Sequence, residues 1–322
     1  MRSKEKICFI INPKAADGAA GKNIPKIEAA AEQFFSHHAI KTTNHPKHAT
    51  ILAREIAKDD FDVIAAVGGD GTCHEIINGL IENDQPINPN LTFTVIPFGT
   101  GSDLIKSLLT PNNIFEAVET AAFGETRQTD IGKALVSTEK GKMCRYFINV
   151  AGFGANGEVV RRANTGSKRF GGRLTFLKAT LETSFTYRSP KAKLTWKKSS
   201  AKQRKPNTWE DRMLSCFLAN GSYCGGGMWV APKGSMHDGL LDITVLAQKT
   251  VASQLIELRS LYNGEIASVE GASCFRAEKV LAEPAHGEII RIDLDGELSG
   301  MLPAEFSLLP KIIPIRAKWT SE

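Results

Sequence analysis

The chain has 322 residues, of which 42% are hydrophobic and 23% are charged, and its formal net charge is +5. This composition is typical of a globular protein long enough for two domains, and no apolar run approaches the roughly 18–20 residues of a membrane-spanning helix. The first apolar stretch, residues 7–11, is too short for a secretory signal. The six cysteines lack the spacing of a zinc site or a disulfide framework, so we expect a cytoplasmic protein.

Strand and helix patterns alternate over about the first 130 residues. Strands are predicted at residues 7–12, 40–43, 61–67 and 91–97, and helices at 23–35, 48–57, 73–81 and 114–122. This alternation predicts an α/β domain with a mostly parallel sheet, whose ligands bind beyond the carboxyl ends of the strands. Asn12, Thr43, Gly68 and Gly99 each lie just past a predicted strand, so we expect them at one edge of the sheet.

The run Gly68-Gly69-Asp70-Gly71-Thr72 joins the third predicted strand to the next helix. Its glycines let the backbone approach an anion, and the helix N-terminus supplies N–H donors and the positive end of a dipole. Asp70 is placed to orient a phosphate-bound cation or water. A plain glycine turn is the alternative, but such a turn has no need of an acid between glycines.

From about residue 131 strand-like runs dominate the sequence. They cover residues 144–150, 192–197, 213–220, 241–246, 288–294 and 312–317, and amphipathic helices are predicted at 174–185 and 251–262. We therefore expect a largely antiparallel β domain over 131–304 after an α/β domain over 1–130.

The segment 159–209 holds fourteen Lys or Arg residues and one acid, Glu182. One interpretation is a solvated loop. The other is a surface that docks on anionic lipid headgroups, at the inner face of the membrane. No nucleic-acid-binding motif accompanies the charge and aromatic residues are few, so we favour the membrane surface over nucleic acid.

The glycine motif resembles the signature shared by diacylglycerol- and sphingosine-type lipid kinases, NAD kinases and, more loosely, phosphofructokinases. Three further runs resemble the lipid kinases, and the bacterial diacylglycerol kinase and YegS-like group among them. These runs are Pro97 to Leu104, Gly225-Gly226-Gly227 through Asp238 to Asp242, and Asp293 to Glu297. The resemblance covers most of the chain.

This resemblance implies a fold and an activity. The fold is an NAD-kinase- and diacylglycerol-kinase-like nucleotide-binding domain followed by a β-sandwich, with residues 305–322 returning to the first domain. The activity is transfer of the γ-phosphate of ATP, with Mg²⁺, to a lipid hydroxyl, most simply that of diacylglycerol to give phosphatidic acid.

The resemblance also assigns residues to the nucleotide. They are Asn12, Pro13, Lys14, Ala15, Ala16, Thr43, Gly68, Gly69, Asp70, Gly71, Thr72, Glu75, Gly99 and Thr100. Asp70, Asp103 and Asp130, which follow predicted strands or lie at turns, are expected to hold the catalytic Mg²⁺ through water, since this ion keeps several of its waters. Asp103 could instead cap a short helix. Ser102 and Leu104 replace the Asn and Phe that are usual in the family.

Two further sites follow from the resemblance. Asp295-Gly296-Glu297 supplies the general base, and we favour Glu297 with Asp295 beside it, although the spacing does not separate the two. Ser235, Asp238 and Leu240 correspond to a structural Mg²⁺ site with an acid and backbone carbonyls as ligands, but Asp238-Gly239 fits an ordinary hairpin turn equally well.

Two other classes of function stay open. An NAD kinase shares the glycine motif, but its Asn-Glu segment for NAD is not found in this sequence. A nucleotide- or lipid-binding regulator without activity is disfavoured by the retained acids, because buried like charges are costly without a function. Acyl-chain sites are lined by interchangeable apolar residues, so monoacylglycerol and sphingoid bases also stay open, as does the oligomeric state.

Overall fold

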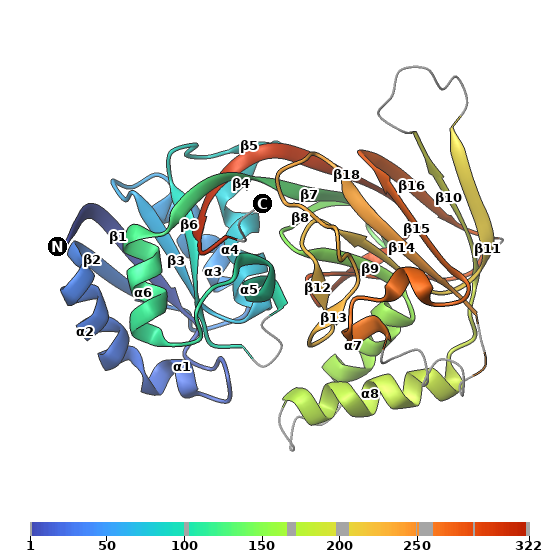
Figure 1. The fold of residues 1–322 in the computed structure, drawn as a ribbon, viewed down its shortest axis with the longest axis horizontal. Helices are drawn as coiled ribbons and strands as arrows, with labels where there is room; N and C mark the ends of the chain where they lie inside the picture. The colour runs from blue at the N-terminus through green and yellow to red at the C-terminus, as the bar shows by residue number, and fades with distance from the viewer. Residues whose placement is uncertain are drawn as a thin grey trace. The chain divides into compact units, whose positions relative to one another are not determined.

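A computed structural model of the chain describes residues 2–99, 103–165, 172–197, 206–248, 250, 260–285 and 287–319. The chain divides into two compact units. Unit 1 contains residues 1–131 and 310–322, and unit 2 contains residues 132–309. Figure 1 shows the helices of unit 1 in blue to green and its C-terminal strand segment in red, and it shows unit 2 as rich in strands. The strands β7 (Glu125–Thr138) and β18 (Glu297–Ala317) include residues of both units.

Unit 1 is built on a parallel sheet, as the alternating pattern predicted. Its order is β2–β1–β3–β6–β18, in which the last strand contributes only its C-terminal part, with Ile315 beside Phe93. The strands are β1 (Ser3–Ile11), β2 (Phe35–Thr42), β3 (Val63–Gly68) and β6 (Thr92–Pro97), and the two-residue β4 (Ile81–Glu82) and β5 (Gln85–Pro86) form a separate hairpin. The helices are α1 (Ala19–Lys22), α2 (Ile24–Phe34), α3 (His48–Ile56), α4 (Asp70–Leu80), α5 (Asp103–Leu108) and α6 (Ile114–Phe123).

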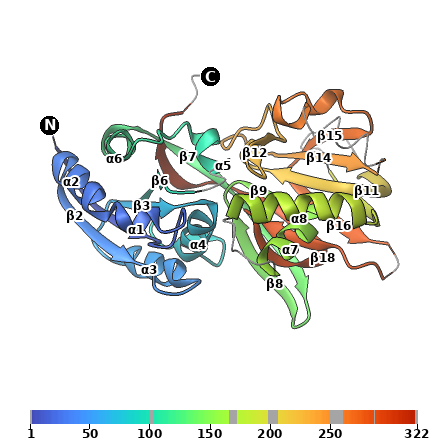
Figure 2. The same cartoon turned by 90° about the horizontal axis from the view of Figure 1, so that it is seen from below.

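Helices cover both faces of this sheet. Alternate residues of β1 and β3, such as Phe9 and Ala65, pack with Ile27 of α2 and Val118 of α6 in one core. Because side chains alternate along a strand, the intervening buried residues face the side of α3 and α4, which pack on each other. Figure 2 shows the sheet between these two helix pairs.

Two element boundaries in unit 1 differ from the sequence prediction. The strand expected at 40–43 begins at Phe35, directly after α2, because Phe35 pairs with Ser3 of β1 and is 1% exposed. The helix expected from residue 73 begins at Asp70, so the glycine motif is the end of β3 and the first turn of α4.

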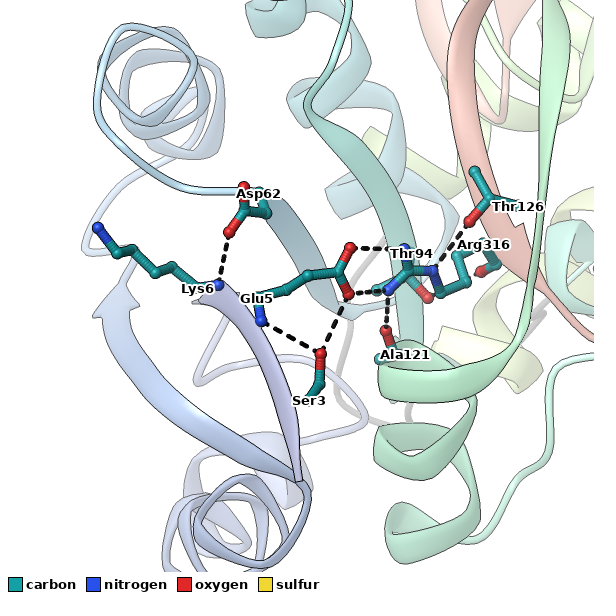
Figure 3. A network of polar contacts seen from close by, with 8 residues as sticks. All are labelled: Ser3, Glu5, Lys6, Asp62, Thr94, Ala121, Thr126 and Arg316. Atoms are coloured by element: carbon teal, nitrogen blue, oxygen red, sulfur yellow. Dashed lines mark hydrogen bonds and ion pairs between the residues drawn. The ribbon is translucent and has the colours of Figure 1, made fainter. Parts of the chain in front are cut away.

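An ion pair within unit 1 attaches β18 to β1 (Figure 3). The Arg316 guanidinium donates to both carboxylate oxygens of Glu5, at 2.6 and 2.9 Å, and also to Ala121 O and Thr126 Oγ1. The Arg316 side chain is only 11% exposed, and its hydrogen bond holds the pKa of Glu5 below its usual value. The bidentate pair therefore fixes the register of the C-terminal strand.

Unit 2 is a strand-rich, antiparallel assembly. One run of strands is β15–β14–β11–β10–β16–β18, and a second run, β11–β9–β17–β18, shares its two outer strands with the first. The bounds are β8 (Gly141–Phe147), β9 (Val150–Gly154), β10 (Lys191–Trp196), β11 (Asn207–Ala219), β14 (Leu241–Ala247), β15 (Ala272–Ala277), β16 (Lys279–Pro284) and β17 (Arg291–Leu294). A core that includes Phe147, Phe153 and Phe306 fills the interior, as in a β-sandwich.

Helices and short elements complete unit 2. They are α7 (Ala155–Thr165), α8 (Gly172–Thr186), the hairpin β12 (Tyr223–Cys224) and β13 (Met228–Trp229), and the 3-10 helix η2 (Ile266–Ser268). The helix predicted at 174–185 is α8, whereas α7 was not predicted, because its sequence is polar and Val159 and Val160 are its only large apolar residues. Most of the helix predicted at 251–262 lies outside the described residues. In the part of the chain that the structure describes, no helix is both long and apolar enough to cross a membrane.

Four strand predictions in the second half of the chain were wrong in extent. The strand expected at 213–220 is β11, which begins at Asn207, and the strand expected at 312–317 is the end of β18, which begins at Glu297. The run 144–150 is not one strand but the end of β8 and the start of β9, with a turn at Ile148 and Asn149. The run 288–294 is a strand only over β17, from Arg291. The break between β8 and β9 has a tertiary cause, because the backbone amides there bind the side chain of Asp295.

Candidate active site

The expected edge of the parallel sheet is present in unit 1. Asn12 N–H donates to Val67 O at 3.0 Å, Thr43 N–H donates to Ile11 O at 2.9 Å, and Phe98 N–H donates to Gly68 O at 2.9 Å. These hydrogen bonds place the ends of four neighbouring strands side by side. The prediction that these turns share one edge is therefore confirmed.

The two glycine turns of this edge approach each other closely. A Cβ on Gly69 would lie 3.1 Å from the Cα of Gly99, and a Cβ on Gly68 would lie 2.3 Å from Thr72 Oγ1. These glycines thus have an intramolecular reason to lack a side chain, beside any approach of a ligand. Thr100 and Ser102, in the second turn, lie outside the described residues.

Asp70 binds the backbone of a neighbouring helix. Its Oδ2 accepts the N–H of Asp103 at 3.2 Å and its Oδ1 accepts the N–H of Leu104 at 3.1 Å. These groups open α5, whose first N–H donors have no partner within the helix. Asp70 therefore links the glycine turn after β3 to the helix that follows β6, a contact that the sequence did not reveal.

Glu75 has the same role for another helix. Its carboxylate accepts the N–H of Lys47 at 2.8 Å and of Ala49 at 3.1 Å, at the start of α3. Its backbone carbonyl also accepts the hydroxyl of Thr50 at 2.8 Å. The side chain predicted to contact the nucleotide thus holds the α3 N-terminus.

The loop after β1 folds on itself. Asn12 Oδ1 accepts the N–H of Lys14 at 3.1 Å, and Ala15 N–H donates to Asn12 O at 3.0 Å. Ala16 and Asp17 have positive φ angles of 49° and 52°, and Pro13 O lies 2.9 Å from the position of a Cβ on Gly21. This compact loop stands at the same sheet edge as the glycine turns.

The other two acids of the predicted magnesium network have different surroundings. Asp103 is 6% exposed and its Oδ1 lies 3.0 Å from Lys106 Nζ. Asp130 had been expected after a strand or at a turn, but it lies inside β7. It is fully buried and accepts the N–H of Lys311 at 2.7 Å, where Lys311 has a φ of +53°.

Two of these three acids are joined by a hydrogen bond. Asp70 and Asp103 meet through the Asp103 N–H. Among the described residues, no group of three or more His, Cys, Asp or Glu side chains gathers closely enough to hold a metal directly. Asp70 and Asp103, which this hydrogen bond brings together, are the carboxylates that would hold a Mg²⁺ ion through its waters, since this ion keeps several of its waters in proteins.

In unit 2 the run Asp295-Gly296-Glu297, which we call the acceptor-side motif, forms a tight hairpin between β17 and β18. Its two turn residues, Asp295 and Gly296, have φ angles of +51° and +82°. Positive φ at both central positions is the type I′ geometry that matches the twist of paired strands. The Asp-Gly pair of this motif therefore forms a regular hairpin turn.

Three backbone N–H groups bind the carboxylate of Asp295. Its Oδ2 accepts the N–H of Ile148 at 3.0 Å, and its Oδ1 accepts those of Asn149 at 2.9 Å and Val150 at 3.2 Å. The residue is 9% exposed. These bonds explain the turn between β8 and β9, because the amide groups there bind a carboxylate and not a neighbouring strand. Glu297, two residues later, is exposed.

The hairpin contains a third acid, Asp293, for which the sequence predicted no role. Burial raises the pKa of its carboxyl to about 7, and the nearby charge of Asp295 acts in the same direction. Its sequence signal was weak, since alternation along β17 says only that it shares a face with Asp295.

At the predicted structural-magnesium site, the Arg276 guanidinium lies beside the acids. Asp238 forms an ion pair with Arg276, whose Nε lies 3.2 Å from Asp242, and Asp238 Oδ1 accepts the N–H of Leu240 at 3.1 Å. The guanidinium supplies positive charge to both acids, so the assignment of Ser235, Asp238 and Leu240 to Mg²⁺ stays a prediction. Sequence reasoning missed Arg276 because it lies on β15, far along the chain.

Comparisons with known proteins match both units. The family model of the diacylglycerol kinase catalytic domain matches residues 6–134, and that of the YegS C-terminal NAD kinase beta sandwich-like domain matches residues 149–317. The diacylglycerol kinase of Bacillus subtilis strain 168 is 28% identical over 299 residues, which are 92% of this chain and 91% of that protein.

Solved structures agree with this match. A crystal structure from Bacillus anthracis strain Sterne, described as a candidate diacylglycerol kinase, is 27% identical with a TM-score of 0.76 and covers 98% of this chain and 96% of its own. Yeast NADH kinase in complex with NADH is 10% identical with a TM-score of 0.50, over 99% of this chain and 84% of that chain, which is a likeness of fold alone.

Proposed function

Because the chain belongs to the lipid kinase family built from a diacylglycerol kinase catalytic domain and a YegS-type β-sandwich domain, we propose that it phosphorylates a lipid alcohol with ATP and Mg²⁺. Diacylglycerol is the proposed acceptor and phosphatidic acid the product. That the protein is a kinase follows from the family. The proposal adds that ATP is the phosphate donor, that Mg²⁺ is the metal and that diacylglycerol is the lipid acceptor.

The nucleotide side of the proposal rests on the start of α4. This helix of eleven residues opens at Gly69 directly beyond a parallel strand, where backbone N–H donors and the helix dipole favour phosphate. Asp70 stands in the same first turn, and its negative charge would repel a phosphate. A cation held by Asp70 and Asp103 through water resolves this conflict, since Mg²⁺ neutralises the charge of the phosphate oxygens in phosphoryl transfer.

The strongest support for the proposal comes from the acceptor-side motif, because its two acids, Asp295 and Glu297, have different surroundings. Three backbone amides occupy the Asp295 carboxylate, so Asp295 is a positioning residue. Glu297, the first residue of β18, is exposed, and we assign to it the role of accepting the proton of a lipid hydroxyl. The rigid turn sets its direction, which a general base requires.

The experiment is transfer of label from γ-³²P-ATP to a panel of lipid alcohols and NAD, with and without Mg²⁺. Wild-type protein is expected to label diacylglycerol only with Mg²⁺. Glu297→Gln should lose at least about a hundredfold in kcat with little change in the KM for ATP, because a base acts in the transition state. Glu119→Gln, an equally conservative change at an exposed position of α6, is the matched control. Labelling of NAD alone, or a fully active Glu297→Gln, would refute the proposal.

The basic segment 159–209 is proposed to attach the enzyme to anionic membrane, from which a water-insoluble substrate must be drawn. Part of its charge is paired: Arg161 and Arg162 contact Glu158, and Lys191 lies 3.0 Å from Glu210. The exposed Arg188, Lys193 and Lys197 add charge near the surface, where each basic residue contributes about 1 kcal/mol of attraction. Phe170, Lys198, Lys202, Arg204 and Lys205 of this segment lie outside the described residues.

Sedimentation with phosphatidylglycerol-containing vesicles tests this attachment. Charge reversal to Glu at Lys197, Lys198, Arg204 and Lys205 should weaken binding and raise the apparent KM for vesicle-borne lipid, and high salt should have the same effect. The matched control reverses four exposed basic residues outside the segment, namely Arg2, Lys4, Lys26 and Lys58. Equal loss in both variants, or binding that ignores salt, would reject the segment as the docking surface.

A further inference from the structure

The hairpin that carries Glu297 contains a partly buried acid, Asp293, that the proposed chemistry does not use. Asp293 lies in the middle of three strands, with Gly152 of β9 as its partner on one side and Leu298 of β18 on the other. The pairing of β17 with β18 shifts register between Ile292 and Asp293, immediately before the turn. The carboxyl of Asp293 is therefore built into the base of the hairpin that carries Glu297.

The contacts of this carboxyl are unequal. The backbone amides of Asp293 itself and of Gly296 interact with it, so it closes the turn from the inside. Its Oδ1, in contrast, is buried without a hydrogen-bond partner among the described residues. One oxygen is thus satisfied by the turn, and the other faces the interior of unit 2.

The Asp293 carboxyl lies close to the backbone of Gly152. A Cβ on Gly152 would lie 2.7 Å from Asp293 Oδ1 and 2.8 Å from Asn156 Nδ2. Asn156 is itself engaged, since its Nδ2 donates to Cys216 O at 3.4 Å and its Oδ1 accepts the hydroxyl of Ser215 at 3.0 Å. Only a residue without a side chain at 152 admits the Asp293 carboxyl, so the position of this acid is enforced by the fold.

The nearby charge that acts on Asp293 is that of Asp295. Asp295 and Glu297 come from its own hairpin, and α7 contributes Glu158, which is paired with Arg161 and Arg162 and lies 3.8 Å from Arg291. β9 contributes no titratable side chain, and β11 contributes the buried Cys216, whose burial raises its pKa well above the usual value. Within the described chain, no Lys, Arg or His forms an ion pair with Asp293.

We propose that Asp293 is a further positioning residue of the kinase, which holds the Glu297 hairpin closed as a neutral acid and releases it on ionisation. The neutral carboxyl accepts a hydrogen bond from the Gly296 N–H, and burial of its Oδ1 without a partner costs little free energy because the group is uncharged. The ionised carboxyl places an unpartnered oxygen and a second negative charge beside Asp295, and both are relieved when the turn moves away from β9. Because Glu297 sits on that turn, loss of closure lowers kcat. This inference rests on the proposed role of Glu297.

The raised pKa of Asp293, about 7, sets where the effect should appear. Below this pH the acid carries its proton and the hairpin is closed. Above it the acid ionises, so kcat on detergent-dispersed diacylglycerol should fall by at least about threefold between pH 6 and pH 8. Asp293→Asn keeps the shape of the neutral acid but does not titrate, and its kcat should vary by less than about twofold over the same range.

The controls separate the possible failures. Asp59→Asn, a matched change at an exposed acid of unit 1, should keep the wild-type profile. An Asp293→Asn profile that falls like the wild type, a wild-type profile without a fall, or a variant that folds but is inactive at every pH would overturn the inference. Carbon NMR of labelled aspartate gives a readout without activity: a carboxyl titrating near pH 7 in wild type and lost in the variant is expected, and its absence from wild type refutes the inference. If Glu297→Gln is fully active, the proposed function itself has failed.

Discussion

Replacement of Asp295 by Asn separates a structural acid from a catalytic base. The side chain of Asn is isosteric with Asp, but it offers one acceptor oxygen, which keeps at most the amides of Asn149 and Val150. Its NH₂ group would face the N–H of Ile148, now 3.0 Å from an oxygen. The loss of one charge-assisted bond and the unpaired buried donor together cost about 2–4 kcal/mol.

This loss should be visible in unfolding experiments. For a unit of this size, about 2–4 kcal/mol lowers Tm by about 5–15 °C. Urea and thermal unfolding followed by circular dichroism, together with kcat, are measured for Asp295→Asn and for Glu297→Gln. The exposed Glu297 is the matched control, and its replacement should change stability by less than about 0.5 kcal/mol while it removes turnover. An Asp295→Asn protein with wild-type stability and no turnover would refute the positioning role and make Asp295 the base.

Three further outcomes are expected. Asp70→Ala should lose turnover and also unwind the start of α5, which hydrogen exchange at the Leu104 amide would report as faster exchange. Arg316→Ala should destabilise the protein by about 2–3 kcal/mol at pH 7 in urea titrations. Since Arg316 lowers the pKa of Glu5, this difference should shrink as the pH falls below about 4.5, where the unfolded Glu takes up a proton, and a constant difference would contradict the pairing. Asp293→Asn should add up to about 4 kcal/mol of stability at pH 8 and almost none at pH 4, because an acid with a raised pKa destabilises the fold only above its unfolded pKa.

The elements of unit 1 could be read from local patterns. Apolar runs of β1 and β3 predict buried strands, and the glycines after β3 predict a close turn, because these signals depend on residues a few positions apart. The Asp-Gly pair after β17 likewise predicts a hairpin, since its conformational preference is local. The edge that gathers Asn12, Thr43 and Gly99 followed from the carboxyl ends of parallel strands meeting at one side.

The sequence by itself therefore determined the fold class, the family and the short list of acids. Only the tertiary structure decided what each acid does. Asp70 binds the start of α5, Asp130 binds the backbone of Lys311, and Asp295 binds the turn at Ile148, more than a hundred residues before it. Asp293 becomes unusual only because Gly152 leaves it room and burial withholds water from it. The partners of a polar group and its access to water are properties of packing between distant segments, and no local spacing of residues encodes them.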